Sequence, residues 1–128
     1  MQKLSSQLVT PGVILFTEHF DACVSFYKDK LGLPVWFEKE GLVCLKFGTS
    51  YLMVERGGMA SATNKPVSSN PTMLRFNVND VANAAQLLAE QGISVEIVTH
   101  DWGTTGTFSD PDVNLCSLKN ADDPYFEE

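Results

Sequence analysis

The stretch Leu31-Gly32-Leu33-Pro34-Val35 has a counterpart 60 residues further along the chain, Gln91-Gly92-Ile93-Ser94-Val95. Both stretches place a glycine, a branched aliphatic residue and a valine in the same register. Glycine is typical of the residue that follows a helix, and a valine commonly begins or continues a strand. Together with the order of the elements around them, these stretches predict two similar halves that each pass from a helix into a strand.

The segment before the first stretch predicts a strand followed by a helix. The apolar run Val13–Thr17 has the composition of a buried strand. Four apolar residues then recur at spacings of four, three and four, which places them on one helical face, with Gly32 as the C-terminal cap. These residues are Phe20, Val24, Tyr27 and Leu31.

Three short strands are predicted after this helix, because three apolar segments are separated by turn-forming residues. They are residues 35–37, 42–47 and 51–55. The next segment, residues 57–71, is rich in Gly, Ser, Asn and Pro and predicts a linker or a mobile flap.

The same order of elements recurs in the second half of the chain. Asp80 is a candidate N-cap and Gly92 a candidate end for a helix over residues 81–91. The predicted strands are residues 73–78, 95–99, 105–108 and 115–118, the last two joined by a turn at 110–112. We therefore expect an α+β fold of two tandem βαβββ modules in a single domain spanning residues 1–128. Module one covers about 9–56, module two about 72–119, and an acidic tail covers 120–128, with fraying expected from Lys119.

The charge balance of 9 basic and 16 acidic residues gives a net charge of −7. This charge disfavours nucleic acid and anionic membranes as partners and suits a neutral or cationic small molecule. The cysteines at 23, 44 and 116 have neither zinc-site nor disulfide-framework spacing. No apolar run reaches the roughly 20 residues of a membrane span, and the N-terminus lacks a signal-peptide core, so a cytoplasmic location is expected.

The alternation of side chains along a strand predicts which face of the sheet each polar residue occupies. In residues 73–78, Arg75 and Asn77 alternate with three apolar residues, so they line the face away from the helices, as Met73 does. The same rule groups Tyr51, Met53 and Glu55 on one face of residues 51–55. A buried arginine needs water, an acid or a ligand. Glu55 is therefore a candidate partner for Arg75, either as a structural salt bridge or as part of a ligand site.

Several short motifs resemble the vicinal-oxygen-chelate superfamily, which includes glyoxalases, bleomycin-resistance proteins and extradiol dioxygenases. The first is residues 19–27 (HFDACVSFY) followed by 28–33 (KDKLGL). The others are 76–80 (FNVND), Trp102-Gly103 and 108–114 (FSDPDVN). Their order spans about Gly12 to Leu118. The resemblance implies curved mixed sheets around a cleft, with the helices on the convex face, and a homodimer.

The metalloenzymes of this superfamily hold a divalent ion with four side chains. Carried over to this sequence, the ligand positions fall on Gly12, on Met53 or Glu55, on Met73 and on Ser117. One carboxylate does not provide the several His and carboxylate ligands such ions need. His19 and His100 are expected at strand ends as surface or capping residues. We therefore expect no metal and no cofactor. Val113 stands where the superfamily's closing turn has glycine, which predicts altered turn geometry.

The favoured function is a non-enzymatic protein, similar to the bleomycin-resistance branch, that binds a small aromatic or cationic molecule and so confers antibiotic resistance. The alternatives are a metal-dependent lyase or dioxygenase with atypical ligands, or a metal-free isomerase using Glu55 as acid or base. The resemblance and strand alternation together give a ligand site with apolar walls and polar groups. Its predicted residues are Phe16, Trp36, Tyr51, Met53, Glu55, Met73, Arg75, Asn77, Trp102 and Ser117.

Overall fold

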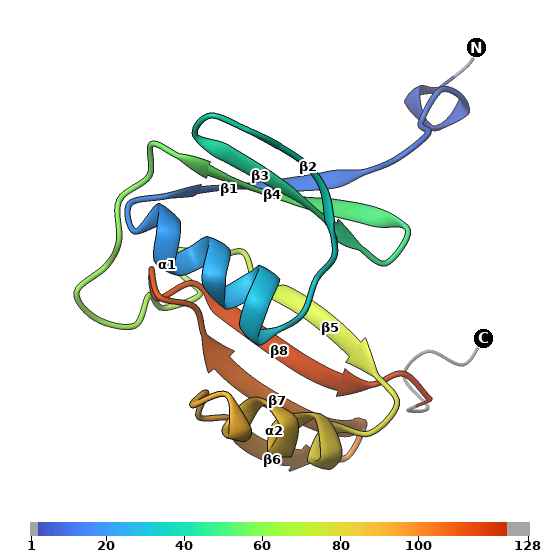
Figure 1. The fold of residues 1–128 in the computed structure, drawn as a ribbon. Helices are drawn as coiled ribbons and strands as arrows, with labels where there is room; N and C mark the ends of the chain where they lie inside the picture. Colours follow the sequence, from blue (N-terminus) through green and yellow to red (C-terminus); the bar gives the residue numbers. More distant parts are fainter. Residues whose placement is uncertain (1–2, 123–128) are drawn as a thin grey trace. The chain divides into compact units, whose positions relative to one another are not determined.

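The computed structural model describes residues 3–122, which form two compact units. Unit 1 extends to Ala60 and unit 2 begins at Ser61. Each unit has one four-stranded mixed sheet that does not close on itself, with a helix against one face (Figure 1). The predicted α+β class and the tandem βαβββ order are confirmed.

Unit 1 begins with a short 3-10 helix, Leu4–Ser6, that buries none of its side chains. Its sheet has the order β1-β4-β3-β2, with β1 parallel to β4 and the other neighbours antiparallel. The elements are β1 (Gly12–Thr17), α1 (Phe20–Val24), a π-helical segment (Ser25–Lys30), β2 (Val35–Lys39), β3 (Leu42–Phe47) and β4 (Ser50–Arg56).

Unit 2 repeats this arrangement with the order β5-β8-β7-β6, in which β5 is parallel to β8. Parallel neighbours require a crossover connection, and the helix of each unit supplies it. The elements are β5 (Leu74–Val78), α2 (Val81–Glu90), β6 (Glu96–His100), β7 (Gly103–Ser109) and β8 (Leu115–Asn120).

The helix of unit 1 differs from the regular helix that the sequence predicted. After α1 the turns widen, and the Leu31 amide donates to the Phe26 carbonyl five residues earlier. The wider turn lets the adjacent residues Phe26 and Tyr27 both enter the core. The expected apolar face was therefore wrong in part. Phe20 and Tyr27 are buried as predicted, whereas Cys23 and Phe26 take the core positions expected for Val24 and Leu31.

The helix of unit 2 follows the prediction closely. The Asp80 carboxylate accepts hydrogen bonds from the amides of Ala82 and Asn83, as an N-cap does. Gly92 adopts φ 79°, and Gly32 has the same φ after the first helix, so both glycines have the left-handed conformation expected at a helix end.

The core of each unit lies between its helix and one face of its sheet. In unit 1 this helix-side face carries Leu52 and Val54 of β4, both fully buried. In unit 2 it carries Cys116 and Leu118 of β8. A Cβ at position 106 would meet Val81, Val95 and Leu118 side chains, so glycine lets helix and sheet approach closely here.

The last strand is longer than predicted. β8 continues through Lys119 and Asn120, and Lys119 is fully buried, so the expectation of fraying from Lys119 was wrong. The pairing of Asn77 and Val78 with these residues extends the parallel ladder and explains the longer strand. The remainder of the predicted acidic tail, residues 123–128, lies outside the described residues.

The segment between the units is attached to the fold at two points. The Ala60 amide donates to Glu18 Oε2 at 2.8 Å within unit 1. Lys65 Nζ donates to Asn114 Oδ1, also at 2.8 Å, within unit 2. Residues 61–64 form the short connector between these two attachment points.

The closing turn keeps a backbone conformation that glycine adopts without strain. Val113 has φ 64° and is the only non-glycine residue in the described part of the chain with positive φ. Asp110 fixes the turn by accepting hydrogen bonds from the amides of Asp112 and Asn114. This network holds valine in the left-handed region, and the expectation that the turn differs from that of the superfamily stays a prediction.

The helices give no indication of a membrane-spanning segment. Within residues 3–122, none combines the length and the apolar character that crossing a bilayer requires.

Candidate functional site

The face of each sheet away from its own helix, here called the far face, carries the predicted site residues. In unit 1 the register places β1, β3 and β4 side chains in rows across this face. Strand alternation was therefore a correct guide for the unit 1 residues. The far face includes Gly12, Ile14 and Phe16 of β1, Cys44 and Lys46 of β3, and Tyr51, Met53 and Glu55 of β4.

Trp36 joins this group because of an irregularity in β2. The pairing shifts between Val35 and Phe37, so two β2 residues pass along a single step of β3. Such a bulge redirects side chains. The Trp36 ring lies edge-on to Tyr51 with centroids 6.0 Å apart, and to Phe37 at 5.7 Å. Phe37 was not predicted as a site residue, because its place depends on this bulge.

Tyr51 occupies the space in front of Gly12. A Cβ at position 12 would overlap the Tyr51 ring, so any side chain there would displace the ring. Gly12 pairs directly with Tyr51 across the parallel ladder, which explains the close approach. The ring therefore fills the position that the superfamily resemblance assigns to the first metal-ligand side chain.

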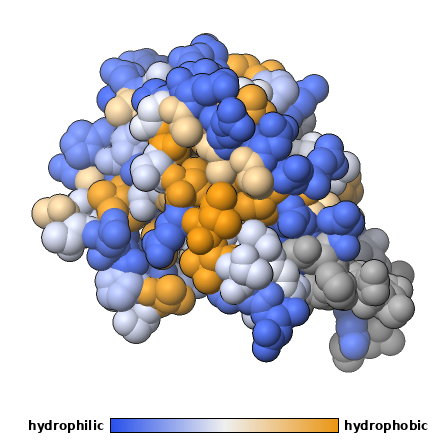
Figure 2. Space-filling view, turned by 90° about the horizontal axis from the view of Figure 1, so that it is seen from below, coloured by the Kyte–Doolittle hydropathy of each residue, from blue (hydrophilic) through white to orange (hydrophobic). Residues whose placement is uncertain are grey.

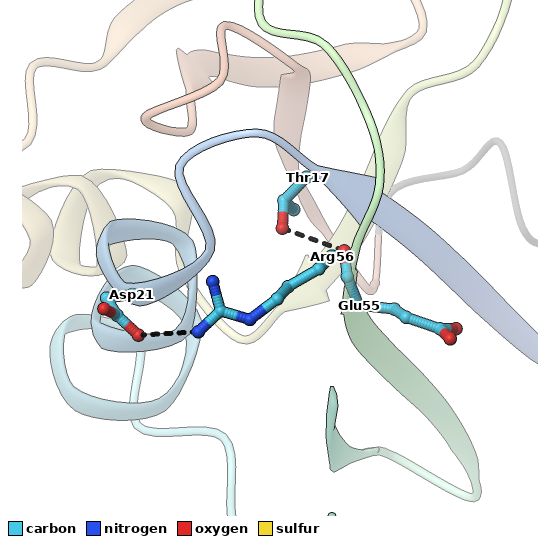
Figure 3. A network of polar contacts seen from close by, with 4 residues as sticks. All are labelled: Thr17, Asp21, Glu55 and Arg56. Carbon is cyan, nitrogen blue, oxygen red and sulfur yellow. Dashed lines mark hydrogen bonds and ion pairs between the residues drawn. The ribbon is translucent and has the colours of Figure 1, made fainter. Parts of the chain in front are cut away.

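Glu55 directs its carboxylate away from the ion pair on the helix side of unit 1 (Figure 3). On that side Arg56 Nη2 lies 3.9 Å from Asp21 Oδ1, and the guanidinium stacks over the Phe20 ring at 4.4 Å. Thr17 Oγ1 donates to the Glu55 backbone carbonyl at 2.9 Å. Glu55 pairs with Phe16 across the parallel ladder, which places its carboxylate on the far face beside Phe16. Unit 1 thus presents aromatic rings, one carboxylate and the amines of Lys39 and Lys46 on one sheet face.

The far face of unit 2 carries Arg75, Asn77 and Ser117. Arg75 of β5 pairs with Ser117 of β8, and Asn77 pairs with Lys119. Ser117 is buried, Arg75 is half-buried and Asn77 is exposed. Met73 precedes β5 and is exposed, so the predicted strand began one residue too early. The predicted contact of Arg75 with Glu55 joins residues of different units and stays a prediction.

A second cluster on this face was largely missed. The His100 and Trp102 rings stack with centroids 4.4 Å apart, and His100 Nε2 lies 3.1 Å from Thr105 Oγ1. Lys119 Nζ lies 5.7 Å from the Trp102 ring centroid, within cation–π range. Only Trp102 had been predicted. Because β6 ends at His100 and pairs it with Gly103, His100 shares the far face with Lys119, which the expectation of a surface histidine did not foresee.

The donor set does not fit the divalent metal of the superfamily's metalloenzymes. Among residues 3–122 no group of three or more His, Cys, Asp or Glu side chains is arranged to hold a metal ion. The Tyr51 ring covers Gly12, and Ser117 Oγ donates to the Leu118 carbonyl. A hydroxyl and a thioether are poor substitutes for the carboxylate and imidazole ligands that these ions prefer.

Cys44 lies in the far-face layer of unit 1, paired with Met53. It is buried, and this burial raises the pKa of its thiol, because the thiolate would lose its hydration. The raised pKa favours the protonated thiol, so we expect Cys44 to be a poor nucleophile.

Several large apolar side chains remain exposed. Phe16 and Trp36, both assigned to the unit 1 far face, are 56% and 53% exposed. Figure 2 shows that apolar residues also gather in patches between hydrophilic ones on the side of the protein that it displays. Exposed aromatic residues on one sheet face are typical of an interaction surface.

Comparisons with known proteins agree with this architecture. The Bacillus subtilis (strain 168) protein YraH, described as uncharacterized, is 31% identical over 117 residues, covering 81% of this chain and 91% of YraH. The lactoylglutathione lyase structure from Agrobacterium tumefaciens has a TM-score of 0.69 at 19% identity, covering 89% of this chain and 93% of that one. The bleomycin resistance determinant encoded on transposon Tn5 has a TM-score of 0.67 at 21% identity, covering 90% and 99%.

The match to a family extends over almost the whole fold. Residues 9–118 match the Glyoxalase/Bleomycin resistance protein/Dioxygenase superfamily, from before β1 into β8. This range contains both βαβββ units and all of the motifs on which the resemblance rested. The chain therefore belongs to the Glyoxalase/Bleomycin resistance protein/Dioxygenase superfamily.

Proposed function

We propose that this protein binds a small aromatic or cationic molecule without a catalytic metal. The observation that carries the proposal is the far face of unit 1, where Trp36 and Tyr51 lie edge to face and Phe16 is more than half exposed. Exposed rings held in a fixed arrangement offer a flat apolar ligand a large contact area with little loss of side-chain freedom.

Glu55 favours a cationic substituent on a ligand at the Phe16 end of this face, which also carries Lys39 and Lys46. Glu55 pairs with Phe16 in the sheet register, and its carboxylate points away from the Arg56–Asp21 ion pair (Figure 3). A cation can pair with the carboxylate and also interact with the ring faces. Sequestration of this kind supports an antibiotic-resistance role like that named for the Tn5 determinant. A homodimer in the cytoplasm is the setting we propose for it.

The metal-dependent alternative has less support, since the described donors do not converge on one point. Metal analysis of the purified protein tests it directly. Nickel, zinc, manganese or iron at stoichiometric amounts, lost in Glu55→Gln, would overturn the proposal.

A binding experiment tests the proposal itself. A Trp102→Phe variant leaves Trp36 as the sole tryptophan, and its fluorescence is titrated with phenethylamine and with the neutral phenethyl alcohol. We expect both to change the emission, with the amine binding about tenfold more tightly, as one charge-assisted hydrogen bond provides.

A matched pair of variants locates the charge effect. Glu55→Gln removes the far-face carboxylate, whereas Glu38→Gln removes a carboxylate on β2 that pairs instead with Lys28. We expect the preference for the amine to disappear only in Glu55→Gln. If Trp36 emission does not change with either probe and changes only with protein concentration, a second copy of the chain covers this face, which would contradict the proposal.

A further inference from the structure

The far face of unit 2 carries Arg75 and Lys119 at strand positions. Arg75 lies beside Ser117, and Lys119 lies beside Thr105 in the next row of the sheet. His100 follows at the end of β6. At far-face positions of β5 to β8 the only acidic residue is Glu96, which is exposed on the outer strand. Two permanent cations thus share this surface in a chain whose net charge is −7.

Arg75 carries an unused hydrogen-bond donor. Its Nε is buried and has no hydrogen-bond partner among residues 3–122. A buried donor on a charged group is costly to leave unpaired, and native structures seldom do so without a reason. The planar guanidinium presents Nε and a terminal nitrogen side by side, an arrangement that matches two oxygens of one oxyanion.

Two buried side chains, Ser117 and Lys119, lie on the same face as Arg75 and can add to its interaction with an anion. Ser117 Oγ, in the adjacent strand, makes a long 3.4 Å bond to the Leu118 carbonyl, and its hydroxyl can turn toward a better acceptor. Lys119 adds positive charge two residues further along the same strand face, and its burial reduces screening by water. The stacked His100 and Trp102 rings border the surface beside Thr105.

We propose that the far face of unit 2 binds an oxyanion, a carboxylate or a phosphate or phosphonate group, with Arg75 as the principal donor. This inference goes beyond the proposed small-molecule function, because it concerns a second face, in unit 2, and the chemical class of group that this face binds. Arg75 is then a binding residue whose Nε gains its missing partner when the anion arrives.

Nuclear magnetic resonance can observe this donor in the unmodified protein. The chain has two arginines, Arg56 and Arg75, so two Nε–H signals are assigned by the variants Arg56→Lys and Arg75→Lys. The protein is titrated with inorganic phosphate and separately with acetate. We expect the Arg75 signal to shift and saturate, while the Arg56 signal, beside Asp21 and the Phe20 ring, stays in place. Parallel shifts of both signals, or no shift of either, would overturn the proposal.

A second experiment separates this proposal from the general one. Phenylphosphonate, benzoate and benzyl alcohol share an aromatic ring and are compared by tryptophan quenching. We expect at least one anion to bind about tenfold more tightly than the alcohol, as one charge-assisted hydrogen bond provides. Arg75→Gln should abolish this preference and Arg56→Gln should keep it. Preference for the tetrahedral phosphonate or for the planar carboxylate identifies which oxyanion the face accepts.

The outcomes of the two experiments are distinguishable. Equal binding of all three probes would contradict the oxyanion site and leave the small-molecule function standing. Binding of none of them, together with no response to phenethylamine, would contradict both. Should Arg75→Gln fail to fold by circular dichroism, the phosphate titration of the unmodified protein still decides the question.

Discussion

The two units have the same topology and the same kind of core but different far faces. Both bury aliphatic and cysteine side chains between helix and sheet, as Leu52 does in unit 1 and Leu118 in unit 2. On the far face, unit 1 carries aromatic rings with Glu55, Lys39 and Lys46, whereas unit 2 carries the half-buried Arg75 and the fully buried Lys119 among polar residues. The difference indicates that the helix-side residues specify the fold, while the far faces are free to determine what is bound.

Core truncation should give the largest effect and tests this division of roles. Leu52→Ala and Leu118→Ala should each lower the free energy of unfolding by about 2–5 kcal/mol, because each leaves a cavity against a helix. The far-face changes Met53→Ala and Ser117→Ala should cost less, which urea denaturation can measure. If a far-face substitution lowers the free energy of unfolding as much as the substitution of its helix-side neighbour, the far face also specifies the fold and the proposed division of roles is wrong.

Filling position 12 should give the next largest effect. Gly12→Ala places a methyl group where the Tyr51 ring lies and should lower the free energy of unfolding by about 1–3 kcal/mol through overpacking. Thermal unfolding of the double variant Gly12→Ala/Tyr51→Ala is the control, since removal of the ring should make the alanine almost neutral. Equal costs in both backgrounds would show that the Tyr51 ring does not fill this space.

The helix caps of the two units should respond differently. Asp80→Ala removes two hydrogen bonds to the first turn of α2 and should cost about 1 kcal/mol in urea denaturation. His19, the corresponding residue of unit 1, makes no side-chain cap hydrogen bond, so His19→Ala should lose no cap contribution. If His19→Ala lowers the free energy of unfolding more than Asp80→Ala does, the assignment of Asp80 as the stronger helix cap is wrong.

A substitution in the closing turn of unit 2 is predicted to stabilise the protein. Unit 1 uses glycines with positive φ at Gly41 and Gly48, whereas unit 2 has Val113 at φ 64°. Val113→Gly relieves the left-handed strain of a branched residue, and part of that gain is offset by greater freedom of the unfolded chain. We expect a net stabilisation of up to about 1 kcal/mol in thermal unfolding. A lower melting temperature would show that the valine side chain contributes packing that outweighs the strain.

The smallest expected effect is the pH dependence from Cys44. Burial raises the pKa of its thiol above that of the unfolded chain, so the unfolded thiol ionises first as pH rises. The resulting stability is fully present below the unfolded pKa and is lost as pH rises through the folded pKa. Denaturation of Cys44→Ala across the alkaline range should therefore show a shallower decline than the unmodified protein, and an identical slope would contradict this assignment.

Much of the fold was predictable because the relevant signals are local. Glycine at helix ends, aspartate at the α2 cap and the alternation in β4 and β5 each depend on a few neighbouring residues. The widened turn at Ser25–Lys30 was not predictable from spacing, since it arises from packing two adjacent aromatic residues against the sheet. The end of β8 at Asn120 likewise depends on pairing with β5.

The candidate site was predictable to the extent that strand alternation governs it. Tyr51, Glu55, Arg75 and Ser117 lie on the faces expected of them. Phe37 and His100 were missed because a bulge and a strand register are properties of pairing between distant segments. The Glu55–Arg75 pair depends on how two separate units are placed, which neither sequence alternation nor sheet register determines.

The attachments on either side of the connector have an evolutionary consequence. Ala60 is held by Glu18 and Lys65 by Asn114, so each unit secures its own end of the chain. A segment bounded in this way can be duplicated, exchanged or recombined as a cassette, with residues 61–64 as the joint. Because each unit also has its own core, a change on one far face need not disturb the other unit, and the two far faces can differ as Glu55 and Arg75 do.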